Sequence, residues 1–129
     1  MERVIIQFLK GSKTGQTEIY PVARFDGLSL GRDPACDVRF DAQRDDLVSR
    51  HHCGIEWDHS HPRIYVLTDL LSSNGTFLNG ERVQEPVQLN DGDVIEFGRN
   101  GPSIRVGFEV IDASAAEPSR ITQNIPRIV

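Results

Sequence analysis

Short apolar runs separated by turn-forming residues extend from residue 4 to residue 110. In the clearest run, 104–110, every second side chain is apolar, so one face of a strand would be packed and the other solvated. Eight less regular runs are rich in β-branched and aromatic residues, namely 4–9, 18–22, 28–30, 37–40, 53–57, 63–67, 76–78 and 94–97. The pattern predicts an all-β fold, a two-sheet β-sandwich of mostly antiparallel strands.

Glycine, asparagine and aspartate occupy the segments between these runs, where they supply tight turns and positive φ angles. Asn79-Gly80 is the best candidate for a two-residue hairpin turn. After Ile111 the residues become small and polar, and the strand alternation stops. We therefore expect one domain over residues 1–111, followed by a flexible tail or linker over 112–129.

The charge balance argues against a protein that holds nucleic acid by bulk attraction. The 129 residues contain 14 Lys and Arg against 19 Asp and Glu, a formal net charge of −5, so any anion site must be local. Twelve of the 14 basic residues are arginine, which suits forked contacts with a carboxylate or phosphate.

Neither a membrane nor an oxidising compartment is indicated. The early apolar run, 4–6, is far shorter than a signal-peptide core or a membrane span, so we expect a soluble, cytoplasmic protein. Cys36 and Cys53 lack the dense spacing of a secreted disulfide scaffold, and both are expected to be reduced. We expect Cys53 to be buried on a strand and Cys36 to be a surface-loop thiol.

Four turn segments at predicted strand ends carry an unusual set of polar residues: 31–32, 49–52, 72–76 and 79–82. Loops at one end of a sandwich can converge into a recognition surface. An arginine together with two serine hydroxyls suits the three acceptor oxygens of a phosphate, and an asparagine amide can grip a peptide backbone. These segments therefore predict a site for a phosphorylated peptide.

The same residues resemble the forkhead-associated (FHA) domain, a phosphothreonine-binding module. The resemblance spans roughly residues 28 to 110 and rests on the order and spacing of four segments: Leu30-Gly31-Arg32, Ser49-Arg50-His51-His52, the run from Leu71 to Gly80, and the run from Leu89 to Gly98. It implies an FHA/SMAD-like sandwich of about eleven strands in two twisted sheets. It also implies that the named loops form the peptide site at one end.

Individual roles follow from the resemblance at matching positions. Arg32 and Ser49 match phosphate-binding positions, Ser73 matches a hydroxyl position, and Asn74 matches the asparagine that grips the peptide backbone. Arg50 matches a position where the family varies among Arg, Lys and Asn, and it is expected to flank the phosphate or touch the peptide. Six further residues are expected to shape the site without touching ligand: Gly31, His52, Gly75, Thr76, Asn79 and Gly80.

Other chemistries are less well supported. The four histidines suggest a metal site, but no carboxylate or cysteine lies at a recognised zinc spacing, so we expect neither a metal nor a cofactor. Ser49 with His52 and an aspartate would suggest a hydrolase, but no nucleophile-elbow pattern surrounds Ser49. We therefore expect a protein that is not an enzyme.

The expected function is recognition of phosphothreonine segments of partner proteins, marked by a Ser/Thr kinase of the same pathway. Thr122 has an aliphatic residue, Ile125, three places later, which suggests a second ligand: a tail phosphorylated at Thr122 that docks on its own or another copy of the domain. The alternative is a structural or assembly domain that forms oligomers without phosphate dependence.

Overall fold

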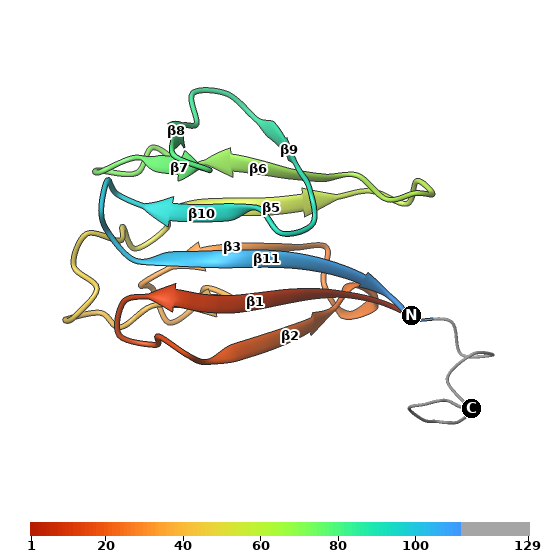
Figure 1. Ribbon diagram of the computed structural model, residues 1–129, viewed down its shortest axis with the longest axis horizontal. Helices are drawn as coiled ribbons and strands as arrows, with labels where there is room; N and C mark the ends of the chain where they lie inside the picture. The colour runs from red at the N-terminus through yellow and green to blue at the C-terminus, as the bar shows by residue number, and fades with distance from the viewer. Residues whose placement is uncertain (112–129) are drawn as a thin grey trace.

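Eleven strands and one short 3₁₀ helix, η1 (Val22–Arg24), make up the regular structure of residues 1–111, the part of the chain that this computed structural model describes (Figure 1). One sheet has six strands in the spatial order β2 (Thr17–Pro21), β1 (Glu2–Lys10), β11 (Ser103–Val110), β10 (Val94–Phe97), β7 (Thr76–Leu78) and β8 (Glu81–Arg82). The other has five strands in the order β4 (Val38–Arg39), β3 (Gly27–Gly31), β5 (Cys53–Trp57), β6 (Tyr65–Asp69) and β9 (Val87–Leu89).

The strand pairs are antiparallel except β3 with β4, which are parallel. The prediction of an all-β, two-sheet sandwich of about eleven mostly antiparallel strands is therefore confirmed. Within residues 1–111, no helix has the length and apolar character needed to cross a membrane.

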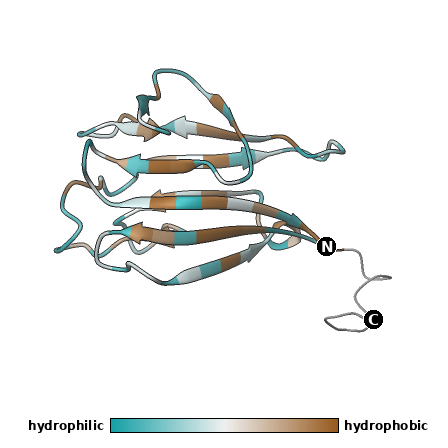
Figure 2. Cartoon of the chain, in the orientation of Figure 1, coloured by the Kyte–Doolittle hydropathy of each residue, from teal (hydrophilic) through white to brown (hydrophobic). Residues whose placement is uncertain are grey.

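The core lies between the two sheets and follows the alternation of the strands. In β1, Val4, Ile6 and Phe8 are buried, because side chains two residues apart point to the same face of a strand. Figure 2 shows the corresponding brown segments along the strands and mostly teal or white loops at the ends. Tyr65 of β6 stacks on Phe108 of β11 with ring centroids 3.9 Å apart, which joins the two sheets.

Nine of the eleven strands coincide with predicted runs, whereas β8 and β9 were not predicted. β4 is shorter than the run 37–40, and β6 begins two residues later than the run 63–67. The hairpin turn at Asn79-Gly80 is confirmed, because Leu78 pairs with Glu81 across it.

The prediction for Cys36 was wrong. This residue is only 4% exposed, because its N–H donates to the carbonyl oxygen of Asp33 at 2.9 Å and folds the chain inward. Its thiol then donates to the carbonyl oxygen of Arg50 at 3.3 Å. Cys53 is buried as predicted, and both thiols are free.

The two ends of the sandwich carry different parts of the chain. In Figure 1, β3 and β6 end and β5 and β7 begin at the left-hand end, so the loops between them gather there. Met1 and Ile111 lie at the right-hand end, where they exchange two backbone hydrogen bonds of 2.6 Å. The loops that carry residues 31–32, 49–52 and 72–75 therefore lie at the end opposite to Ile111, after which residues 112–129 follow.

Candidate functional site

The end of β3 continues alongside the residues that precede β5. The N–H of Arg32 donates to the carbonyl oxygen of Ser49 at 3.1 Å, and the N–H of His52 donates to the carbonyl oxygen of Leu30 at 2.9 Å. These backbone hydrogen bonds bring together two sequence segments that are about twenty residues apart. Arg32 and Ser49 are therefore held together. We call the loops that meet here, residues 31–32, 49–52 and 72–75, the corner.

Gly31 permits this close approach. A Cβ atom at Gly31 would lie 2.1 Å from the carbonyl oxygen of Arg50, far inside van der Waals contact. Only glycine fits unless the two segments separate. The expectation that Gly31 shapes the site thus has a specific steric basis.

The ring of His52 connects the segment before β5 with the loop between β6 and β7. It is fully buried, its Nδ1 accepts the backbone N–H of Ser49 at 3.0 Å, and its Nε2 lies 2.9 Å from the carbonyl oxygen of Gly75. This geometry assigns the proton to Nε2, which donates to Gly75. The ring also packs edge-on against Phe97, with centroids 5.0 Å apart. Burial lowers the pKa of His52, so the imidazole is neutral near pH 7.

The guanidinium of Arg32 reaches across to the loop 41–48. Its Nε donates to the carbonyl oxygen of Val48, and its Nη1 donates to the carbonyl oxygen of Ala42 at 2.8 Å. An arginine has five N–H donors, so three of them have no hydrogen-bond partner within residues 1–111. Arg32 therefore braces the loop and keeps donors for an anion.

Asp45 holds the same loop in place from the other side. It is only 3% exposed and accepts hydrogen bonds from the hydroxyl of Ser12 at 2.6 Å and the N–H of Asp41 at 3.0 Å. The loop before Ser49 is thereby tied to the turn after β1. Such ties reduce the conformational freedom that ligand binding would otherwise remove.

Ser49, Ser73 and Asn74 meet where the loops converge. The N–H of Ser73 donates to Oγ of Ser49 at 2.9 Å, which leaves the Ser49 hydroxyl proton to donate elsewhere. Nδ2 of Asn74 donates to the carbonyl oxygen of Leu47 at 2.9 Å. The side chains of Ser73 and Asn74 are exposed, so they can meet a ligand.

Arg50 is also exposed, but it already has a partner. Its side chain is 71% exposed and lies 2.6 Å from the carboxylate of Asp33, which His51 approaches at 3.6 Å. The backbone N–H of Ala35 and then Arg50 lower the pKa of Asp33, which keeps it ionised. A ligand phosphate would compete with Asp33 for Arg50, whereas it would meet no such competitor at Arg32.

Asp69, a residue that sequence reasoning missed, fixes the loop after β6. Its Oδ1 accepts the hydroxyl protons of Ser72 at 2.5 Å and of the buried Thr76 at 2.6 Å. Burial acts to raise the pKa of Asp69, but these two hydroxyls outweigh it and leave the pKa below its usual range. An aspartate followed by serine three residues later is a local capping pattern and would have been the signal.

Asn79 and Gly80 form the turn between β7 and β8 with φ angles of 49° and 90°. The side chain of Asn79 donates to Asp93 at 3.0 Å and accepts the N–H of Val94 at 2.9 Å. These bonds stabilise the hairpin that follows the Asn74 loop, and they are not part of the corner itself. Thr122 lies outside the described residues.

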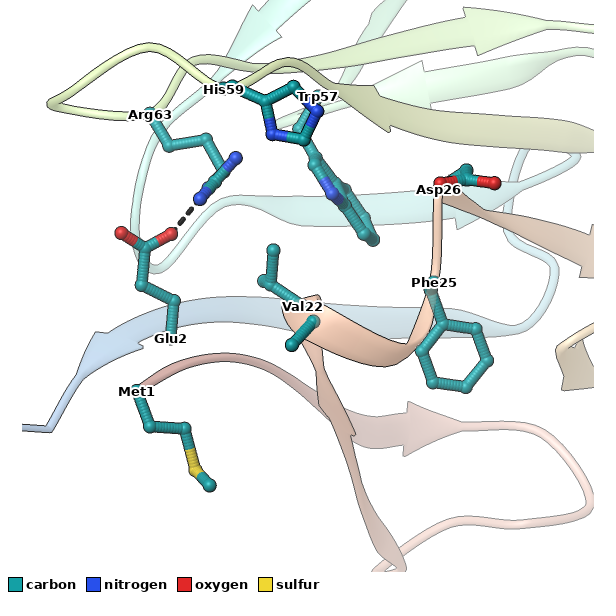
Figure 3. Close-up of a pocket in the computed structure, with 9 residues that line it drawn as sticks. Met1, Glu2, Val22, Phe25, Asp26, Trp57, His59 and Arg63 are labelled. Carbon is teal, nitrogen blue, oxygen red and sulfur yellow. Dashed lines mark hydrogen bonds and ion pairs between the residues drawn. The ribbon is translucent and has the colours of Figure 1, made fainter.

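Two other features of the described chain lie away from this corner. Residues 1–111 contain no cluster of three or more His, Cys, Asp or Glu side chains positioned to hold a metal ion. A cavity of about 610 Å³ at the opposite end is lined by residues that include Val22, Trp57 and His59, and Figure 3 shows the ion pair of Arg63 with Glu2 there. None of the predicted site residues lines it.

Comparison with known proteins places this arrangement in a family. The FHA domain model matches residues 28–98, which is more than half of the chain. The chain belongs to the FHA domain family. The matched region contains the whole corner, from Gly31 to Gly75, and the hairpin turn at Asn79-Gly80.

Curated relatives match about half of the chain. The FHA domain is 46% identical over 59 residues to FhaA of Mycobacterium tuberculosis and 40% identical over 66 residues to human proliferation marker protein Ki-67. These alignments cover 46% and 51% of this chain, but only 10% and 2% of the relatives. The chain thus spans a tenth or less of the length of these relatives.

Solved FHA domains match over most of the described fold. An Arabidopsis thaliana FHA domain has a TM-score of 0.73 at 30% identity, with 89% of this chain and 92% of that chain covered. The FhaA FHA domain, in complex with the intracellular domain of Rv3910, has a TM-score of 0.63 at 33% identity over 80% and 98%. A domain from an analysis of phosphothreonine-dependent FHA interactions has a TM-score of 0.66 at 33% identity over 84% and 99%.

Proposed function

We propose that this FHA domain binds phosphothreonine segments of partner proteins, so that phosphorylation of a partner by a kinase causes it to bind this domain. The main observation is the hydrogen-bonded corner, in which the backbone of Arg32 is bonded to that of Ser49, and the Arg32 guanidinium and the Ser49 hydroxyl both keep unused donors. A phosphate brings a charge of −1.5 to −2 and three acceptor oxygens. Phosphothreonine-dependent interactions of a similar FHA domain support the same ligand class.

The proposed division of roles follows the geometry. Arg32 and Ser49 hold the phosphate, Ser73 adds a hydroxyl, and Asn74 grips the peptide backbone. We assign Arg50 a weaker, flanking role because Asp33 already neutralises it. Gly31, His52, Gly75 and Thr76 hold the loops in position, and Asn79 with Gly80 supports the adjoining hairpin.

The proposal is one of recognition without catalysis. A serine nucleophile needs a base that accepts its hydroxyl proton. Here Nδ1 of His52 accepts the backbone N–H of Ser49, and Nε2 donates to the carbonyl oxygen of Gly75. Both ring nitrogens are therefore committed to loop structure.

The partner, kinase and tail belong to the same proposal. We assign recognition to residues 1–111 and treat 112–129 as a tail that carries Thr122. A Ser/Thr kinase would act upstream, in the cytoplasm. The net charge of −5 supports a protein ligand over a nucleic-acid ligand.

Replacement of Arg32 tests the proposal directly. We expect Arg32→Ala to weaken phosphothreonine-peptide binding by roughly a hundredfold or more, since it removes two charge-assisted contacts of about 1.5–3 kcal/mol each. Fluorescence anisotropy with an oriented phosphothreonine peptide library measures the loss. Because Arg32 also braces Ala42 and Val48, thermal denaturation must show that the variant is folded.

Arg24→Ala is the matched control, because it removes the same charge from an exposed position of η1, outside the corner. It should bind like the wild type. Equal affinity of the wild type for phosphorylated and unmodified peptides would reject the proposal. A stable dimer at micromolar concentration that ignores phosphopeptide would instead favour the assembly role.

A further inference from the structure

Leu71 has an unusual backbone conformation for its residue type. It lies in the loop between β6 and β7 with a φ of 58°, in the left-handed region where a Cβ atom is disfavoured. It is 97% exposed, the highest value for a large apolar residue within residues 1–111. Glycine or asparagine would suit this conformation better.

Hydrogen bonds on both sides hold Leu71 in this conformation. Before it, the N–H of Leu70 donates to the carbonyl oxygen of His52 at 3.0 Å. After it, the hydroxyl of Ser72 donates to Asp69 at 2.5 Å. The chain must turn between these two anchors, so the Leu71 side chain is directed into solvent.

The exposed side chain gains nothing within residues 1–111. A leucine in the left-handed region is strained, and an exposed leucine forgoes the benefit of burial. Strain of this kind persists where the surroundings enforce it, and it is concentrated at ligand-binding segments. The compensating contact is therefore to be sought in a bound molecule.

Leu71 directly adjoins the candidate site. It is two residues from Ser73, so their Cα atoms are at most about 7 Å apart, and the N–H of Ser73 donates to Oγ of Ser49. Leu47 and Leu70 are also exposed, at 38% and 44%. Exposed leucines thus lie beside the polar corner. The loop between β6 and β7 carries both Leu71 and Asn74, the residue proposed to bind the peptide backbone.

We propose that Leu71 is a specificity-determining residue that contacts an aliphatic side chain flanking the phosphothreonine in the bound segment. This inference rests on the proposed function. A peptide held by Asn74 must pass the loop that carries Leu71, so the occupant is the phosphopeptide itself. The contact would bury apolar area on both partners and compensate for the strained loop.

Leu71→Asn removes the apolar group and suits a positive φ angle. The probes are phosphothreonine peptides with leucine or serine at each of the three positions on either side of the phosphothreonine. The full-length wild type should prefer leucine about tenfold at one position. Leu71→Asn should reduce that preference to less than about twofold, with the affinity for the all-serine peptide unchanged and Tm equal or higher.

Ile64→Asn is the matched control, because it removes an exposed side chain (44%) from the segment between β5 and β6, outside the corner. It should leave the leucine preference intact. An unchanged preference in Leu71→Asn, or a lowered Tm without a change in preference, overturns the inference. The inference is also overturned if the wild type is a dimer and Leu71→Asn is a monomer, because Leu71 would then serve self-association. No phosphopeptide binding by the wild type would instead reject the proposed function, and this inference with it.

Discussion

At the scale of single residues, His52 is essential to the structure of the site although it is not proposed to touch ligand. One imidazole satisfies the N–H of Ser49 and the carbonyl of Gly75, and it packs on Phe97 in the core. Each buried polar group left unpaired would cost about 1–3 kcal/mol. A neutral ring with the proton on Nε2 is thus a structural requirement of the site.

The buried ring predicts a loss of stability on mild acidification. Burial lowers the folded-state pKa of His52, so the unfolded chain binds more protons as the pH falls below about 6.5. The free energy of unfolding should therefore fall by up to about 1.4 kcal/mol between pH 7.5 and 5.5 from this residue. Urea denaturation at the two pH values measures the change.

NMR titration of the His52 imidazole identifies the residue responsible. Asp69 also has a lowered pKa, but its contribution is lost only at more acidic pH, as the pH falls through the carboxylate range. A His52 that titrates at or above 6.5 in the folded protein would contradict the prediction. So would a pH-independent free energy of unfolding in this window.

Residue types in the site could be predicted from sequence, but several of their partners could not. Arg32 and Ser49 stand in recognisable segments. The carbonyl oxygens that receive the Arg32 guanidinium are ten and sixteen residues away, in a loop with no distinctive side chain at those positions. Neither the composition nor the periodicity of a sequence indicates which backbone carbonyls accept such hydrogen bonds, so they can be identified only in the folded structure.

At the scale of elements, the corner forms only if the end of β3 approaches the segment before β5 closely. We expect Gly31→Ala to destabilise the domain by more than about 2 kcal/mol and to abolish phosphopeptide binding, since its Cβ would collide with backbone at 2.1 Å. Chemical denaturation and peptide anisotropy measure the two effects.

Gly54→Ala in β5 is the matched control, because its Cβ would meet its nearest neighbour at an ordinary 3.6 Å. It should bind like the wild type and be no less stable. If Gly31→Ala behaved like Gly54→Ala, the close approach would not matter for the site.

Strand length explains which elements the sequence could reveal. β11 has eight residues and alternates clearly, so its pattern is unambiguous. β8 has two residues and β9 has three, which is too short for a period of two to be distinguished from a loop. β8 exists because the Asn79-Gly80 turn folds it back onto β7, so a turn signal alone would have indicated it.

At the scale of the whole molecule, the candidate site and the exit of residues 112–129 lie at opposite ends of the sandwich (Figure 1). β11 alone is about 26 Å long, at about 3.3 Å for each residue. Thr122 follows Ile111 by eleven residues, which reach at most about 36–40 Å when fully extended. Docking of Thr122 on its own domain would therefore require a nearly extended chain around the loops.

A linker close to its maximum length gives a low effective concentration within one molecule, whereas docking on a second copy has no such restriction. We therefore expect a chain phosphorylated at Thr122 to self-associate head to tail, with an average mass that rises with concentration. Analytical ultracentrifugation over about 1–100 μM would measure this, with Arg32→Ala in the phosphorylated chain as the control that stays monomeric. A phosphorylated chain that remains monomeric while its Ser49 and Asn74 resonances shift would show that the segment reaches its own site. Monomeric mass without such shifts would mean that Thr122 is not a ligand of this domain.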